Sequence, residues 1–282
     1  MQRPGPDVTD SLVHLVVAVD AEAKPLISWF GLRRQQPDRG FPVFRHAHIA
    51  LVVSGPGKAN AAAATAHLHA ACGYPRNALW VNIGVAGHRD LPVGSCQVAH
   101  AITDSATGRS WYPPQAITPP WPGAPVMTVD TPDTDYACGE LADMEASGFY
   151  ATACRFSTSE LVQVVKVVSD NAGHPAENLR ASHLTALLGQ QLDALDLFLH
   201  RLGRLANELS EGTATSDQEL APWLARWAFS VTQRRQLAEQ LRRLKVLDGT
   251  PIQPQDASAA RSAEEVIRTL AERAGSRPLP LP

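Results

Sequence analysis

The feature that most constrains this chain is a set of short, nearly continuous apolar runs rich in valine and isoleucine. Each run is bounded by polar or turn-forming residues. A strand that faces water on one side alternates apolar and polar residues, whereas a continuous apolar run indicates a strand covered on both faces. We therefore predict four buried strands, at residues 13–19, 49–53, 78–83 and 161–168.

Helical segments separate these runs. Residues 60–72 are rich in alanine, and residues 144–156 carry apolar side chains at helical spacing. Strands that alternate with helices predict an α/β fold of three layers, in which helices flank a central mixed, largely parallel sheet. Residues 105–135 are rich in proline and predict a long irregular loop, serving as a substrate lid or a subunit contact.

The rest of the chain is helical in pattern. Residues 183–209 repeat leucine at amphipathic spacing and predict one long helix that closes the α/β domain. A polar break at residues 211–217 precedes two further apolar stripes at helical spacing. We expect an α/β domain at residues 12–210 and a helical C-terminal extension at residues 215–282.

Charge and composition exclude several classes of partner. The 282 residues carry a net charge of −3, which predicts neither nucleic acid nor a membrane surface as a partner. The cationic cluster at residues 234–245 is interpreted as a solvated helix face. The first apolar run is too short to span a bilayer, and the polar N-terminus does not resemble a secretion signal. Four widely spaced cysteines suit a reducing compartment. We expect a cytoplasmic protein that uses no metal and no cofactor.

Five short segments place acidic, polar or glycine residues at predicted strand ends and helix starts, where open α/β sheets bind ligands. Taken singly, the carboxylates equally suit helix N-termini or turns, and the first glycine turn lacks the spacing of a nucleotide-binding loop. The segments are Asp20-Ala21-Glu22, Ser54-Gly55-Pro56-Gly57-Lys58, Asn82-Ile83-Gly84-Val85-Ala86-Gly87, Asp143-Met144-Glu145 and Ser169-Asp170-Asn171.

The order and spacing of these five segments resemble the nucleoside phosphorylase/nucleosidase family, which includes the purine nucleoside phosphorylases and the methylthioadenosine/S-adenosylhomocysteine nucleosidases. The resemblance covers about residues 12–210 and implies the family's phosphorylase-like fold. It also implies cleavage of the N-glycosidic bond of a purine nucleoside or 5′-thionucleoside through an oxocarbenium-like transition state.

The resemblance also implies roles for individual residues. Asp170 would protonate or hydrogen-bond the leaving purine, Glu22 would activate the attacking water, and Glu145 would hold the ribose hydroxyls and stabilise the developing cation. Substrate binding would involve Met144, whose thioether would pack on the sugar, and the backbone at Ala86 and Gly87, together with Asp143 and Ser169.

The choice between water and phosphate as nucleophile depends on phosphate ligands. By resemblance, the bacterial phosphorylases carry an arginine and a serine at the positions of Asn82 and Val85, which cannot hold a phosphate dianion. We therefore favour hydrolysis. The alternatives are phosphorolysis, with phosphate as a second substrate, and a non-catalytic nucleoside-binding sensor.

Several departures from the family pattern indicate a divergent member with an unusual substrate. Val85 replaces a serine, Lys166 replaces an arginine, and Asp143 replaces a glutamate. The aromatic residue that stacks on the base is missing before Asp143, and Trp111, Tyr112 and Tyr136 are the candidates to replace it. Family members are homo-oligomers, so we expect this chain to be one too, with residues 105–135 as a candidate contact.

Overall fold

The computed structural model describes residues 12–35, 40–75, 77–137, 139–213 and 217–276. The chain divides into two units, Met1–Glu208 and Leu209–Pro282, which are described separately below.

Four parallel strands form the centre of the first unit. They are β4 (Ile49–Val53), β1 (Val13–Val17), β5 (Leu79–Gly87) and β10 (Val162–Asp170), adjacent in that order. Every residue of β1, β4 and β10 is buried, as the continuous apolar runs predicted. The four predicted strands are therefore confirmed, and their carboxyl ends meet at one edge of the sheet.

The remaining strands make the sheet mixed. Strands β3 (Val43–His46) and β2 (Arg33–Arg34) extend the β4 side with antiparallel pairings. On the other side, β6 (Cys96–Asp104) pairs antiparallel with β10 and with β7 (Ser110–Trp111), and parallel with β8 (Gly123–Thr128). The short β9 (Leu141–Asp143) then pairs with both β8 and β5. The pairings thus run from β5 through β10, β6, β8 and β9 back to β5.

This topology corrects two expectations from the sequence. The sheet is α/β and mixed, but it is not largely parallel, because the strands added beyond the central four bring antiparallel pairings at both ends. Residues 105–135 are not one irregular loop, since they contain β7 and β8. Pro125 lies opposite a register shift in β6, so the sheet tolerates a residue that has no N–H to donate.

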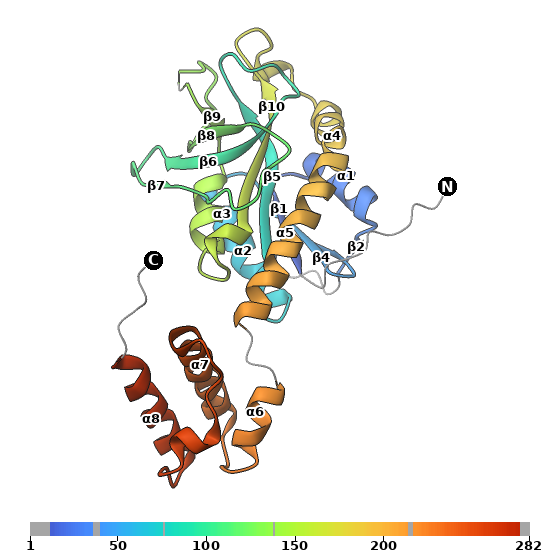
Figure 1. Ribbon diagram of the computed structural model, residues 1–282. Coiled ribbons are helices and arrows are strands. Elements are labelled where there is room, and N and C mark those ends of the chain that lie inside the picture. Colours follow the sequence, from blue (N-terminus) through green and yellow to red (C-terminus); the bar gives the residue numbers. More distant parts are fainter. Residues whose placement is uncertain (1–11, 36–39, 76, 138, 214–216, 277–282) are drawn as a thin grey trace. The chain divides into compact units, whose positions relative to one another are not determined.

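Two pairs of helices cover opposite sides of the sheet (Figure 1). Helices α2 (Lys58–Ala71) and α3 (Ala146–Ala153) pack against each other so closely that a Cβ at Gly148 would lie 2.0 Å from the Lys58 carbonyl oxygen. Helices α1 (Asp20–Phe30) and α4 (Ala181–Gly189) form the other pair.

Helix boundaries differ from the sequence expectations at two places. The single helix expected at residues 183–209 is two helices, α4 and α5 (Leu192–Thr213), because α4 ends at Gly189. The helix expected from residue 144 begins at Ala146, because Asp143 belongs to β9 and its carboxylate accepts hydrogen bonds from the first amides of α3.

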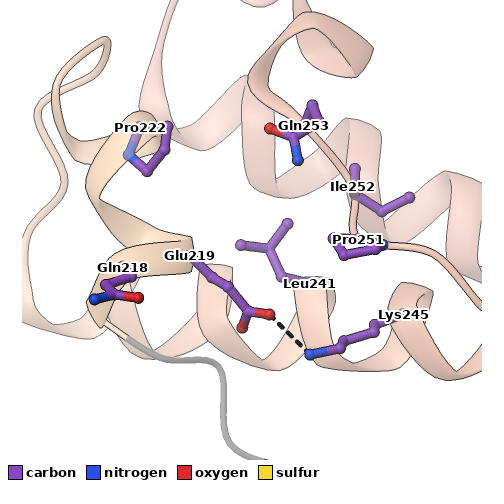
Figure 2. Close-up of a pocket in the computed structure, with 8 residues that line it drawn as sticks. All are labelled: Gln218, Glu219, Pro222, Leu241, Lys245, Pro251, Ile252 and Gln253. Atoms are coloured by element: carbon purple, nitrogen blue, oxygen red, sulfur yellow. Dashed lines mark hydrogen bonds and ion pairs between the residues drawn. The ribbon is translucent and has the colours of Figure 1, made fainter.

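The second unit is helical, as the apolar stripes predicted. It contains α6 (Asp217–Leu224), α7 (Val231–Asp248), the 3-10 turn η3 (Pro254–Ala257) and α8 (Ala263–Gly275). Its core contains Trp223, Trp227, Leu237, Leu241, Leu244, Val266 and Leu270. A cavity of about 390 Å³ lies between α6, α7 and the segment before η3, and the Glu219–Lys245 ion pair (2.8 Å) lies on its wall (Figure 2).

Among the helices within the described ranges, none is both long enough and apolar enough to cross a bilayer.

Candidate active site

A cavity of about 250 Å³ lies at the carboxyl ends of the central strands. Sequence reasoning expected ligands to bind there, because parallel strands of an α/β sheet open a crevice at these ends. The eight residues predicted from the sequence all line this one cavity: Glu22, Ala86, Gly87, Asp143, Met144, Glu145, Ser169 and Asp170.

Glu22 is anchored by backbone amides. It lies in the first turn of α1, where its Oε2 accepts hydrogen bonds from the amides of Ala18 (2.8 Å) and Val19 (3.2 Å). Its Oε1 accepts one from the amide of Val85 (2.9 Å). A Cβ at Gly84 would lie 2.8 Å from that Oε1, so the strand needs glycine there. Glu22 is only 2% exposed, and burial raises its pKa.

Glu145 also lines the cavity and is held between a backbone amide and a buried cation. Its Oε1 accepts a hydrogen bond from the amide of Gly57 (2.8 Å), in the glycine turn before α2. Its Oε2 lies 3.8 Å from the ammonium of Lys166. Burial raises the pKa of Glu145, and the nearby Asp143 adds to that effect.

Asp143 is bound on both carboxylate oxygens by protein groups. Its Oδ1 accepts a hydrogen bond from the Thr128 hydroxyl (2.8 Å), and its Oδ2 accepts from the amides of Glu145 (3.1 Å) and Ala146 (2.8 Å). Lys166 Nζ is 2.7 Å from the same Oδ2. These contacts fix the start of α3 and therefore the position of Glu145; a direct contact of Asp143 with substrate stays a prediction.

Asp170 ends β10 and is held by two hydroxyl groups. Ser169 Oγ donates a short hydrogen bond to Asp170 Oδ1, and the Tyr136 hydroxyl donates one to Oδ2 (2.9 Å). A Cβ at Gly87 would lie 2.8 Å from Oδ2, which leaves room for no larger residue on β5 at this point.

The three candidate aromatics occupy different places. Tyr112 is 73% exposed, and Trp111 belongs to β7 beside Arg109. Neither lines the cavity, and Tyr136 reaches Asp170 without lining it. Within the part of the chain that the structure describes, no aromatic ring lines this cavity.

Sequence reasoning missed a second ionic cluster next to the site. Lys58 Nζ is 2.9 Å from Asp104 Oδ2 and 2.9 Å from Asp130 Oδ1, and the Ser147 hydroxyl donates to the same Asp104 oxygen. The cluster joins the starts of α2 and α3 to the end of β6. The Gly-Lys step at the glycine turn was the only signal for it, and that step does not reveal distant partners.

The charges on the cavity wall are all of one sign. Its carboxylates belong to Glu22, Asp133, Asp143, Glu145 and Asp170. Among the described lining residues there is no lysine, arginine or histidine. Lys166 lies behind the wall, 1% exposed, where Asp143, Glu145 and Glu22 together raise the pKa of its ammonium despite burial. In the described ranges no group of three or more His, Cys, Asp or Glu residues is arranged to hold a metal ion.

Comparison with known proteins gives similarity at the level of structure. No protein-family model matches this sequence, and no curated protein matches it. Among solved structures, the 5′-methylthioadenosine nucleosidase of Arabidopsis thaliana is similar at 18% identity with a TM-score of 0.53, covering 70% of this chain and 96% of that one.

Two structures from Helicobacter pylori are similar at 14% identity. The 5′-methylthioadenosine/S-adenosylhomocysteine nucleosidase has a TM-score of 0.53, covering 67% of this chain and 97% of that one. The futalosine hydrolase has a TM-score of 0.51, covering 67% and 98%.

The first unit is thus an α/β structure whose cavity opens at the carboxyl ends of its central strands. Its fold is similar to that of these two nucleosidases and the futalosine hydrolase, at 14–18% sequence identity. The resemblance inferred from the five sequence segments is therefore confirmed at the level of the fold.

Proposed function

We propose that this chain hydrolyses the N-glycosidic bond of a purine nucleoside or 5′-thionucleoside. The observation that carries the proposal is the cavity wall with five carboxylates and no cation among its described residues. Breaking the bond places positive charge on the ribose, and carboxylates already in place stabilise that charge without reorganising. The names of the similar structures, nucleosidases and a futalosine hydrolase, support the same reaction class.

The same wall disfavours phosphate as the nucleophile. Two like unit charges about 4 Å apart repel by on the order of 4 kcal/mol at the effective dielectric of a protein surface. A phosphate dianion would therefore need cationic ligands, and Lys166 is already paired with Asp143. Water carries no such penalty.

Glu22 is proposed as the base that deprotonates the attacking water. Its raised pKa makes it a stronger base than an exposed glutamate, and its three amide contacts hold it in one place. Glu145, which lines the same cavity, would accept hydrogen bonds from the ribose hydroxyls. Met144, also a lining residue, would pack on the sugar.

Asp170 is proposed as the group that assists departure of the base. Ser169 and Tyr136 hold its carboxylate, so it is already aimed when the base arrives. The backbone at Ala86 and Gly87 would form the wall on which the base lies. Asp143 would act by positioning Glu145.

The direct test is an assay of base release from purine nucleosides and 5′-thionucleosides, with and without phosphate, and with Asp170→Asn as the matched variant. Release in phosphate-free buffer that is lost in Asp170→Asn would support hydrolysis. Release only with phosphate would instead establish a phosphorylase. Binding without turnover, unchanged in Asp170→Asn, would establish a sensor.

The proposal includes a cytoplasmic, homo-oligomeric protein in which residues 12–210 carry the reaction and residues 215–282 form a separate extension. Residues 105–135, which include β7 and β8, are the proposed subunit contact. Sedimentation of a monomer that turns over substrate normally would contradict this part of the proposal.

A further inference from the structure

Tyr136 is buried in the connection between β8 and β9, close to the proposed site. It is 5% exposed and has a φ of 51°, in the left-handed region that residues other than glycine rarely adopt. A non-glycine residue stays in such a conformation when its surroundings fix it in place. The contacts of Tyr136 show what does so.

The hydrogen bonds of the Tyr136 hydroxyl have a defined direction. The amide of Ala176 donates to the hydroxyl oxygen (3.1 Å), and an amide N–H can only donate. The hydroxyl hydrogen is therefore free to point at Asp170 Oδ2, 2.9 Å away. Burial raises the pKa of Tyr136, so the phenol stays protonated and remains a donor.

Tyr136 also joins three segments around the cavity. Its carbonyl oxygen accepts a hydrogen bond from Arg89 Nε (3.1 Å), in the segment after β5. Ala176 begins the 3-10 turn η2 (Ala176–Asn178), in the segment after β10. Through these bonds one residue connects the segments that follow β5, β8 and β10, and the segments after β8 and β10 contribute to the cavity wall.

This arrangement fixes the carboxylate of Asp170 at the cavity wall. Tyr136 holds one of its oxygens, Ser169 holds the other, and Gly87 closes one side. Tyr136 itself does not line the cavity, and its hydroxyl reaches the site through Asp170.

We propose that Tyr136 is the positioning residue for Asp170: its hydroxyl holds the carboxylate at the angle that departure of the base requires. This inference rests on the proposed hydrolysis of a nucleoside. It assigns to Tyr136 a role in the step where the base leaves, and none in binding the ribose.

The test compares two leaving groups in wild type and Tyr136→Phe. A purine needs help from Asp170 to depart, whereas p-nitrophenolate leaves p-nitrophenyl riboside unaided. We expect kcat for the purine nucleoside to fall by about 10- to 100-fold, a part of the roughly 100- to 10,000-fold that a positioned acid contributes, because Asp170 itself stays in place. KM should change little, and the p-nitrophenyl riboside should react at nearly the wild-type rate.

Two further variants make the result specific. Tyr74→Phe removes a hydroxyl from a tyrosine that is 68% exposed and does not line the cavity, and it should leave both rates unchanged. Adding Tyr136→Phe to Asp170→Asn should cause no further loss, because residues that act through one another are not additive. If Tyr136→Phe proves unstable, Ala176→Pro puts a ring carbon in place of the amide hydrogen that points at the Tyr136 hydroxyl; this displaces the hydroxyl from Asp170 and should show the same selectivity.

Each other outcome overturns the inference. An unchanged kcat in Tyr136→Phe, or equal losses on both substrates, means that Tyr136 does not act through Asp170. If wild type releases no base from any nucleoside, the proposed function fails and this role fails with it. Those two results are separated by the wild-type assay alone.

Discussion

Lys166 Nζ lies 2.7 Å from Asp143 Oδ2, and both side chains are almost completely removed from solvent. Asp143 belongs to the wall of the proposed active site, and Lys166 lies behind that wall, where it also faces Glu145 at 3.8 Å. One buried ammonium therefore balances carboxylates on two sides. Each partner depends on the other, because an uncompensated charge at this depth is very unfavourable.

The first prediction concerns the stability of that pair. Lys166→Met should lower the free energy of unfolding by about 3–5 kcal/mol, because it leaves Asp143 buried without its cation. Urea denaturation measures the change. The double variant Lys166→Met/Asp143→Asn should recover part of the loss. A loss below about 1 kcal/mol in the single variant would show that the pair adds little to stability.

Gly84 gives a prediction about geometry. A methyl group there would lie 2.8 Å from Glu22 Oε1 and would push the carboxylate out of position. We expect Gly84→Ala to reduce base release by roughly 100-fold, as a shift of about 1 Å in a catalytic group does. Gly189→Ala is the matched control, since a Cβ at Gly189 meets nothing within 4 Å. Equal activity in the two variants would show that Glu22 is not the base that activates the water.

The pH dependence of activity tests Glu22 differently. A base must be ionised to accept a proton, and burial raises the pKa of Glu22 above its ordinary value of 4.5. Activity should therefore fall on the acidic side at a pH above 4.5. Rate measurements across pH locate this fall in activity, and Glu22→Gln should remove it together with most of the activity. A fall centred at or below pH 4.5 would be inconsistent with Glu22 as the base.

We expect the buried His14 to make the folded protein less stable in acid. It is 1% exposed on β1, 4.3 Å from the Trp80 ring, and burial lowers its pKa from 6.5 to about 3, with His69 and Arg45 adding to the effect. The folded chain therefore holds His14 neutral, while the unfolded chain protonates it below pH 6.5. The contribution of His14 to stability is complete above pH 6.5 and is lost progressively as the pH falls toward 3.

Between pH 7 and pH 5 this loss should be about 2 kcal/mol, from 1.36 kcal/mol per pH unit. Urea denaturation of wild type and His14→Phe at both pH values isolates it, with exposed His46→Gln as the control. If the free energy of unfolding falls equally with pH in wild type and His14→Phe, the acid sensitivity belongs to other groups.

The central strands and the site were predictable because both depend on local sequence. A continuous run such as 161–168 can only be a covered strand, and Asp170 at its end must lie at the carboxyl edge of the sheet. Strand β8 was missed because Pro125 argues against a strand unless the bulge in β6 is known. Strand β9 was missed because three residues are too few to show periodicity.

The role of Tyr136 had no local signal at all. The residue lies 34 positions from Asp170, and its side chain reaches that carboxylate through a left-handed bend that the tyrosine type does not favour. Only the folded chain brings the two together. The same holds for Lys58, whose partner Asp104 lies 46 positions further along the chain, at the end of β6.

The circuit of pairings from β5 through β10, β6, β8 and β9 back to β5 has a mechanical consequence. Asp170 is carried by β10 and Asp143 by β9, and each of these strands is hydrogen-bonded to β5 and to the outer arc. Because the circuit is closed, β9 and β10 cannot move apart without breaking backbone hydrogen bonds to their neighbouring strands. The width of the cavity is therefore set by main-chain bonds that almost any sequence can form. Substitutions of side chains outside this closed circuit are therefore expected to leave the distance across the cavity unchanged.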